Sequence, residues 1–94
     1  MIRIDFNGRF RLMYEELVGK EIDFKQVIFH RIELFRKNPQ DTRLDNHPLT
    51  KSLKGKYAFS IDDDIRIVYE WIGKSTVRFL GIGKHSKVYS NKLN

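Results

Sequence analysis

Apolar residues recur along the chain with two different periods, and these predict a strand followed by two helices. Apolar and polar residues alternate over residues 2–6, which favours a short strand with one buried face. Helical spacing then predicts a first helix capped by Asn7 and ended by Gly19. A second helix is expected to open at Asp23 and to stop before Pro39. Its apolar stripe consists of Phe24, Val27, Ile28, Ile32 and Phe35.

The second half of the chain mixes β-branched and aromatic runs with turn residues, which predicts strands. The expected segments are a ragged strand at 49–54, a strand at 57–61, an acidic turn at 62–64 and a hairpin with strands at 65–72 and 76–82 around Gly73-Lys74. Helices and strands come in separate runs, so the predicted fold class is α+β. We expect a small single domain over residues 1–94, with an N-terminal strand and a helical hairpin packed on a largely antiparallel sheet of three to four strands.

The hairpin also predicts a register. A two-residue loop would pair Val68 with Phe79 and Arg66 with Gly81. Arg66 would then share a face with Phe79, and a guanidinium beside a glycine leaves open space suited to a phosphate. Alternatively, Arg66 reaches the rim of the sheet or pairs with Glu70. The residues expected on the other face, toward the helices, are Ile65, Ile67, Leu80 and Ile82.

Charge is distributed unevenly along the 94 residues. The formal net charge is +6, from 18 Lys and Arg and 12 Asp and Glu. Residues 1–46 hold nine basic and eight acidic side chains, whereas residues 47–94 hold nine basic and four acidic ones, so the excess lies in the second half. A basic half suggests a polyanionic partner, either nucleic acid or an acidic protein. The alternative is a solvated basic surface that serves solubility.

Composition excludes several other classes of protein. The chain has no cysteine, so disulfides and thiolate metal sites are ruled out, and its three histidines lack the spacing of a zinc motif. We therefore expect no metal and no cofactor. No apolar run approaches the roughly 20 residues of a membrane helix, and the first ten residues do not form a signal peptide. A cytoplasmic protein without a membrane partner is expected.

Four motifs carry a resemblance to a known family. They are Asn46-His47-Pro48-Leu49, Leu53-Lys54-Gly55, Asp64-Ile65-Arg66-Ile67-Val68-Tyr69-Glu70 and Gly83-Lys84-His85-Ser86-Lys87-Val88-Tyr89. In this order and spacing, over roughly residues 20–90, the chain resembles the RelE/ParE toxin superfamily of toxin–antitoxin modules. It is most similar to the YafQ-like and RelE-like mRNA endoribonucleases (mRNA interferases), which act on the ribosome. The family's fold, a strand, two helices and antiparallel strands, agrees with the α+β prediction.

The resemblance implies a metal-independent endoribonuclease that cleaves mRNA in the ribosomal A site. The ribose 2′-hydroxyl attacks the adjacent phosphate, which leaves a 2′,3′-cyclic phosphate and a 5′-hydroxyl. The reaction needs a base, an acid and cations that hold the developing charge. Histidine suits the first two roles because its ordinary pKa, about 6.5, lies near working pH. The implied partners are mRNA on the ribosome and an acidic cognate antitoxin, with which the toxin would form a hetero-oligomer.

Catalytic roles carry over to three residues by position in these motifs. The resemblance implies that His85 is the general acid, that His47 is the general base and that Asp64 orients or assists a histidine. The alternatives without catalytic function are that His47 is a turn residue before Pro48 and that Asp64 is one of three acidic turn residues. His30, on the charged side of the second helix, is expected to be structural or to face solvent.

Binding roles carry over to a further set of residues. The resemblance implies that Arg66 binds the scissile phosphate, that Lys54 adds positive charge and that Tyr89 stacks on a base. Lys84, in the basic tail, is also predicted to contact RNA, and Tyr89 could instead pack as a core aromatic. In one respect the chain departs from the family, because Ser60 stands where the YafQ-like pattern has another histidine. Serine does not transfer protons near neutral pH, and Arg66 is expected to compensate.

Two other functions remain open on the same fold. A ParE-like gyrase poison would act by binding a protein target, and that branch lacks the histidines at positions 47 and 85. A non-catalytic basic domain would only bind RNA, the ribosome or a partner protein. A shared fold does not separate these functions, so the side chains of the site have to decide.

Overall fold

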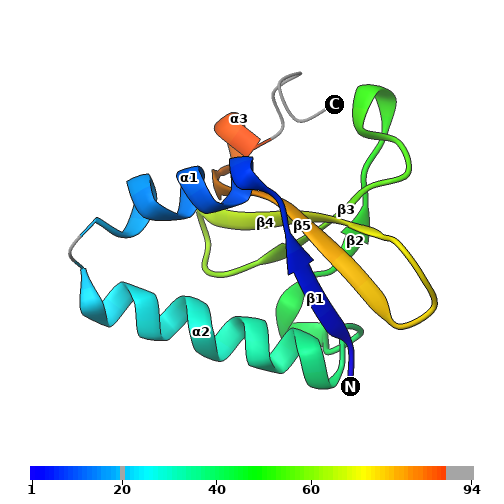
Figure 1. Cartoon of the computed structure of the whole chain (residues 1–94), viewed down its shortest axis with the longest axis horizontal. Helices are drawn as coiled ribbons and strands as arrows, with labels where there is room; N and C mark the ends of the chain where they lie inside the picture. Colours follow the sequence, from blue (N-terminus) through cyan, green and yellow to red (C-terminus); the bar gives the residue numbers. More distant parts are fainter. Residues whose placement is uncertain (20, 89–94) are drawn as a thin grey trace.

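The computed structural model describes residues 1–19 and 21–88 (Figure 1). Its helices and strands are β1 (Arg3–Phe6), α1 (Gly8–Val18), α2 (Ile22–Lys37), β2 (His47–Pro48), β3 (Tyr57–Ser60), β4 (Ile65–Trp71), β5 (Thr76–Lys84) and α3 (His85–Val88). Two 3₁₀ turns interrupt the connections, η1 (Thr42–Leu44) and η2 (Lys51–Leu53). No helix in these described ranges is both long and apolar enough to cross a membrane.

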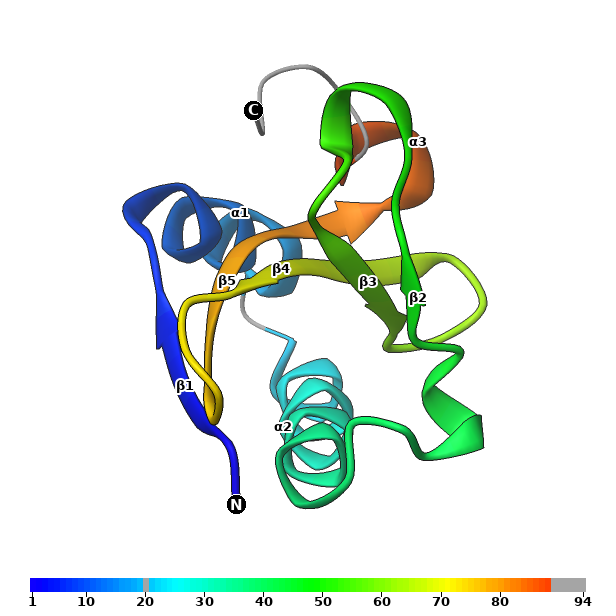
Figure 2. The same ribbon diagram turned by 90° about the vertical axis from the view of Figure 1, so that its right-hand side faces the viewer.

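The strands form one mixed sheet in the order β1-β5-β4-β3-β2. β1 runs parallel to β5, and the other neighbours are antiparallel. Figure 2 shows α2 on one side of the sheet, and α3 together with the loop around η2 on the other side. The predicted α+β fold is confirmed. The sheet has five strands because β1 pairs with β5 at one edge and the two-residue β2 pairs with β3 at the other.

Local cap residues set the ends of α1 as predicted. The side chain of Asn7 accepts a hydrogen bond from the backbone N–H of Phe10 at 2.8 Å, which satisfies one of the unpaired donors of the first turn. Gly19 ends the helix with a positive φ of 50°, and its N–H donates to the carbonyl of Glu15.

The start of α2 differs from the prediction. The helix begins at Ile22 with Glu21 as N-cap, and no side chain caps it. Asp23 instead lies in the first turn, where its carboxylate interacts favourably with the positive end of the helix dipole. The predicted end is confirmed, because Asn38 is extended, with φ −154° and ψ 93°, directly before Pro39.

The predicted strand at 49–54 is wrong. Pairing with β3 ends at Pro48, and the chain then folds back, with Leu53 N–H donating to the Thr50 carbonyl at 3.1 Å. Lys51 takes a positive φ of 57°, which is incompatible with a strand. The reason is burial, since the turn η2 brings Leu53, only 4% exposed, against the sheet.

The predicted register of the β4–β5 hairpin is also wrong. The loop spans four residues, 72–75, and Trp71 pairs with Val77. Val68 pairs with Gly81 but Tyr69 pairs with Phe79, so Leu80 is the extra residue of a β-bulge. As a result, Arg66 lies opposite Gly83 rather than Gly81.

The bulge also exchanges the faces of two side chains. Because side chains alternate along a strand, one inserted residue moves its neighbours to the opposite side. Phe79 packs with the helices and Leu80 packs on the other face, the reverse of the prediction. Ile65, Ile67 and Ile82 face the helices as expected.

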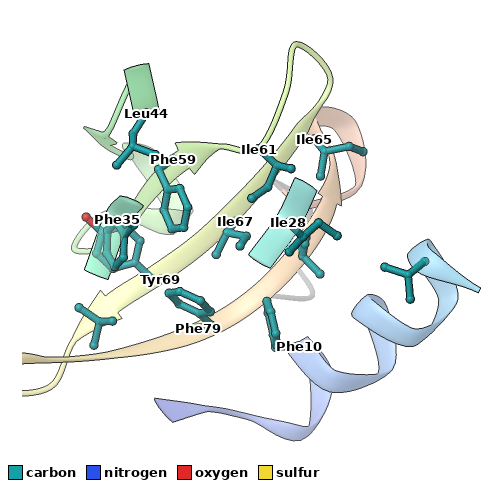
Figure 3. Packing of buried hydrophobic residues seen from close by; sticks show 13 residues of the cluster. Phe10, Ile28, Phe35, Leu44, Phe59, Ile61, Ile65, Ile67, Tyr69 and Phe79 are labelled. Atoms are coloured by element: carbon teal, nitrogen blue, oxygen red, sulfur yellow. The ribbon is translucent and has the colours of Figure 1, made fainter. Parts of the chain in front are cut away.

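The face of the sheet toward α2, which we call the α2 face, carries the larger core. Figure 3 shows its aromatic centre, where Phe35 of α2 stacks on Phe59 with ring centroids 4.3 Å apart. Tyr69 and Phe79 meet Phe35 at tilted or edge-on angles. Such aromatic packing buries large apolar areas and contributes most of the core's stability.

The opposite face, which we call the α3 face, carries a smaller apolar cluster. Its buried members are Leu53, Ala58, Val68, Leu80 and Val88. These residues come from η2, three strands and α3, so the cluster fixes the η2 loop and α3 against the sheet. Polar side chains occupy the rest of this face, and they include several of the predicted site residues.

Candidate functional site

Strand register places three polar residues on the α3 face. Directly paired residues of antiparallel strands project to the same side of a sheet. His47 pairs with Ala58, which pairs with Val68, and both of these belong to the α3-face cluster. Ser60 pairs with Arg66, two residues further along the same strands and therefore on the same face.

Arg66 is held against the acidic turn. Its Nη1 donates to the backbone carbonyls of Asp62, at 2.7 Å, and Ile65, at 3.2 Å. The alternative pairing with Glu70 does not occur, because the carboxylate of Glu70 lies 3.6 Å from Arg78 instead. Both bonds of Arg66 use one nitrogen, so its other N–H groups remain available within the part of the chain that the structure describes.

Asp64 and His85 are brought together through the backbone. The N–H of His85 donates to the carbonyl of Asp64 at 3.2 Å, which fixes the start of α3 beside the acidic turn. Asp62 organises this turn, because its Oδ1 accepts from the N–H groups of Asp64 and Ile65 at 2.8 and 2.7 Å. Asp64 and His85 are both exposed. Asp64, Arg66 and His85 therefore gather at one end of the sheet.

The side chain of Lys84 projects from the α2 face of the sheet. Lys84 pairs with Ile65, which belongs to the α2-face core, so its side chain leaves β5 on the side opposite to that of Arg66. There it lines a hollow of about 460 Å³ together with Glu16 of α1. Tyr89 lies outside the described residues.

His47 lies at the opposite edge of the α3 face. β3 and β4 separate its strand from β5, which corresponds to about 14 Å between strand axes. Its ring is half-buried, and its Nδ1–H donates to the carbonyl of Asp45 at 2.8 Å. The ring lines a second hollow, of about 350 Å³, formed by residues 47–53. Lys54, exposed, follows η2. The structure thus puts His47 and His85 on one side of the sheet without bringing the imidazoles into contact.

The connection that carries His47 is anchored by two residues, Asn46 and Tyr69, that belong to the family motifs but to which the sequence assigned no role. Asn46 donates from Nδ2 to the Pro39 carbonyl at 2.8 Å, and the Tyr69 hydroxyl donates to Asn46 Oδ1 at 2.9 Å. Burial raises the pKa of the Tyr69 hydroxyl to about 12, so this group stays protonated and able to donate. The side chain of Tyr69 is 1% exposed.

Arg31 of α2 makes a second anchor. Its Nη2 donates to the Arg43 carbonyl at 2.6 Å, and its Nε donates to the Ser60 carbonyl at 3.3 Å. Arg43 in turn binds the side chain of Asp41, and these hydrogen bonds lower the pKa of that carboxyl to about 2. The two hydrogen bonds of Arg31 leave no local pattern in the sequence, since they join residues 29 and 12 positions apart.

Within residues 1–19 and 21–88, no three His, Asp or Glu side chains group as metal ligands do. His30 lies exposed on α2, with its ring against that of Phe29. It is therefore on the far side of the sheet from His47 and Arg66.

Comparison with known proteins adds solved structures of the same fold. No family model and no curated protein matches the sequence. A variant of YafQ from E. coli, with a histidine changed to glutamine, superimposes with a TM-score of 0.77 at 20% identity. The alignment covers 96% of this chain and 100% of that one.

Two further structures agree. A copper-bound mutant toxin from Helicobacter pylori gives a TM-score of 0.76 at 23% identity, covering 95% of this chain and 100% of the toxin. A chain of the E. coli DinJ–YafQ complex gives a TM-score of 0.75 at 21% identity, covering 96% of this chain and 100% of that one. The chain therefore has the fold of the RelE/YafQ-like toxins.

Proposed function

We propose that this protein is the toxin of a type II toxin–antitoxin module and that it cleaves mRNA on the ribosome. The observation that carries the proposal is the composition of the α3 face. It holds the imidazole of His47 and the guanidinium of Arg66, with Asp64 and His85 at its end. These are the group types that metal-independent transfer of a phosphodiester to a neighbouring hydroxyl requires.

Arg66 would bind the scissile phosphate. Its guanidinium is already oriented by the Asp62 and Ile65 carbonyls, so it needs little reorganisation as charge develops on the phosphate oxygens. Gly83, opposite Arg66 on β5, adds no side chain above this part of the sheet. The RNA backbone could therefore approach the strands closely here.

The two histidines would divide the proton transfers, which requires both side chains to turn inward along the α3 face, because β2 and β5 lie about 14 Å apart. His47 takes the proton of the ribose 2′-hydroxyl while the 2′-oxygen attacks phosphorus. The bond from phosphorus to the 5′-oxygen breaks, and protonated His85 gives that oxygen a proton. The products are a 2′,3′-cyclic phosphate and a 5′-hydroxyl. Asp64, fixed beside His85 by the backbone hydrogen bond, would orient the imidazole of His85.

Positive charge outside this centre would recruit the RNA. Residues 47–94 carry an excess of five positive charges, and Lys54 and Lys84 are both exposed. Lys84 approaches from the α1 side, so its contact would be with a neighbouring nucleotide rather than with the scissile phosphate. Tyr89 is proposed to stack on a base.

The partners follow from the same surface. mRNA in the ribosomal A site is the proposed substrate, which places the activity in the cytoplasm. An acidic antitoxin is proposed to cover the basic surface and form a hetero-oligomer, as YafQ forms a complex with DinJ. We propose that residues 1–94 act as a single unit.

Expression in growing bacteria, followed by primer extension on translated messages, tests this function. Wild-type protein should arrest growth and produce cuts that disappear when translation initiation is blocked. His85→Gln should abolish both effects, whereas His30→Gln, a histidine on the far side of the sheet, should leave them intact. Cuts in ribosome-free RNA would contradict ribosome dependence. Growth arrest by His85→Gln without any cuts would show that the protein poisons a target by binding.

A further inference from the structure

The imidazole of His47 is bound to a group that fixes the position of its proton. Nδ1 lies 2.8 Å from the carbonyl oxygen of Asp45. A carbonyl oxygen only accepts hydrogen bonds, so Nδ1 carries the proton whenever the ring is neutral. Nε2 then holds the lone pair. A general base needs that lone pair directed at the substrate, so the nitrogen left to act is Nε2.

The backbone of Asp45 sets the direction of this carbonyl. Asp45 has φ 49° and ψ 44°, the left-handed helical conformation, as the C-terminal cap of η1. Aspartate, asparagine and glycine adopt this conformation readily, whereas a β-branched residue there is strongly disfavoured. The type of residue at position 45 therefore controls where the carbonyl points.

Asn46 ties the same segment to the sheet. The Pro39 carbonyl can only accept, so the Asn46 amide must turn its Nδ2 toward Pro39 and its Oδ1 toward Tyr69. The Tyr69 hydroxyl then has to donate to Oδ1, at 2.9 Å. Tyr69 is buried in the α2-face core, so its bond to Asn46 ties the residue before His47 to that core.

We propose that Asp45 and Asn46 are positioning residues that hold His47 in the Nδ1–H tautomer and present Nε2 to the substrate. The proposal rests on the proposed role of His47 as the general base. It adds that the base is prepared in the free protein, before RNA binds. The side chain of Asp45 is not required, since the backbone carbonyl makes the contact, but the left-handed conformation is required.

Nitrogen-15 NMR of the His47 ring measures the tautomer directly. Spectra are recorded at increasing pH until the ring nitrogens stop shifting, so that the neutral ring is observed. The expected spectrum shows a protonated Nδ1 and an unprotonated Nε2. His30, the exposed ring on α2, is the internal reference and should show exchange between the two tautomers. A protonated Nε2 in His47 of the wild-type protein overturns the proposal without any variant.

Variants at position 45 separate conformation from side-chain chemistry. Asp45→Gly and Asp45→Asn keep the left-handed conformation and should preserve both the tautomer and the cleavage rate. Asp45→Val should shift His47 to mixed tautomers and lower the rate of mRNA cleavage at least about tenfold, out of the 10²–10⁴ that a general base contributes. Asn46→Ala, which removes both anchoring bonds, should lower the rate in the same direction.

These readouts distinguish the two proposals. If His47 has the Nδ1–H tautomer but the wild-type protein cleaves no mRNA, the positioning stands and the proposed function fails. If the wild-type protein cleaves mRNA but Asp45→Val keeps both the tautomer and the rate, the positioning fails and the function stands. A rate lost equally in Asp45→Gly and Asp45→Val would also overturn the proposal, because it would assign the effect to the carboxylate.

Discussion

The two faces of one sheet differ in what their side chains can do. On the α2 face, alternate residues of β3 and β4 insert Phe59, Ile67 and Tyr69 into a core that α2 seals. On the α3 face, the residues between them include Ser60 and Arg66, and only a small apolar cluster lies beneath η2 and α3. Because side chains alternate along a strand, the same segments provide a stable floor and a reactive surface.

The residues of the candidate site are positioned by the core, but they are not part of it. Arg66 is placed by the pairing of β4, whose other face is locked by aromatic packing. Tyr69 links the two faces, since its ring lies in the α2-face core and its hydroxyl holds Asn46, next to His47. Substitutions on the two faces should therefore separate into effects on stability and effects on activity.

The largest effect is expected in the α2-face core. Phe35 is fully buried and stacks on Phe59, so Phe35→Ala should lower the free energy of unfolding by about 3–5 kcal/mol through lost apolar burial and a cavity. Urea denaturation measures this loss. Leu12→Ala, at an exposed position of α1, is the control and should change it by less than about 0.5 kcal/mol. Equal losses in the two variants would contradict the placement of the core.

Arg66→Gln should show the opposite pattern. Losing the cation that holds the phosphate should lower the cleavage rate by about 10²–10³. The free energy of unfolding should fall by no more than about 1 kcal/mol, since only the hydrogen bonds to the turn are lost. Arg78→Gln, on the neighbouring strand and paired with Glu70, is the matched control and should cleave at the wild-type rate. Equal activity in Arg66→Gln and Arg78→Gln would remove Arg66 from the site.

Tyr69→Phe should produce a smaller effect that crosses between the faces. The change leaves Asn46 Oδ1 without its donor, which should cost about 1–3 kcal/mol of unfolding free energy. Tyr57→Phe removes a hydroxyl from the ring stacked on Tyr69 and serves as the control, with an expected change below about 0.5 kcal/mol. If the two variants unfold at the same urea concentration, the hydrogen bond between Tyr69 and Asn46 does not contribute to the free energy of unfolding.

The same hydroxyl predicts a dependence on alkaline pH. The pKa of Tyr69 is raised from 10.0 to about 12 in the folded state, so the unfolded chain loses this proton first. Between these values the unfolded state binds fewer protons, and stability falls as pH rises. The stability gap between wild type and Tyr69→Phe, measured by denaturation at several pH values, should therefore narrow above pH 10. A constant gap would contradict the raised pKa.

Much of the fold could be predicted because its signals are local. Asn7, Gly19 and Pro39 each act on the backbone within a few residues, and the apolar periods distinguish helices from strands. The hairpin register could not be predicted, because the bulge at Leu80 and the four-residue loop depend on packing of both faces at once. That error placed Arg66 opposite the wrong glycine.

The candidate site was predictable in its residue types but not in its support. His47, Asp64, Arg66 and His85 stand out through the family resemblance, and their roles remain proposals. The contacts that hold them come from distant segments, such as the bond between Tyr69 and Asn46, 23 residues apart. Single-sequence patterns contain no signal for such pairs. The position of Lys84 on the far side of the sheet likewise follows only from the strand pairing.

Cleavage of ribosome-bound mRNA by purified His47→Gln and His30→Gln tests the central claim most directly. The two variants remove the same group from opposite sides of the sheet. If the reaction takes place on the α3 face, His47→Gln should cleave about 10²–10⁴-fold more slowly than wild type, and His30→Gln should cleave at the wild-type rate. The two variants should have equal free energies of unfolding. Equal cleavage by the two variants would contradict the assignment of the reaction to this face.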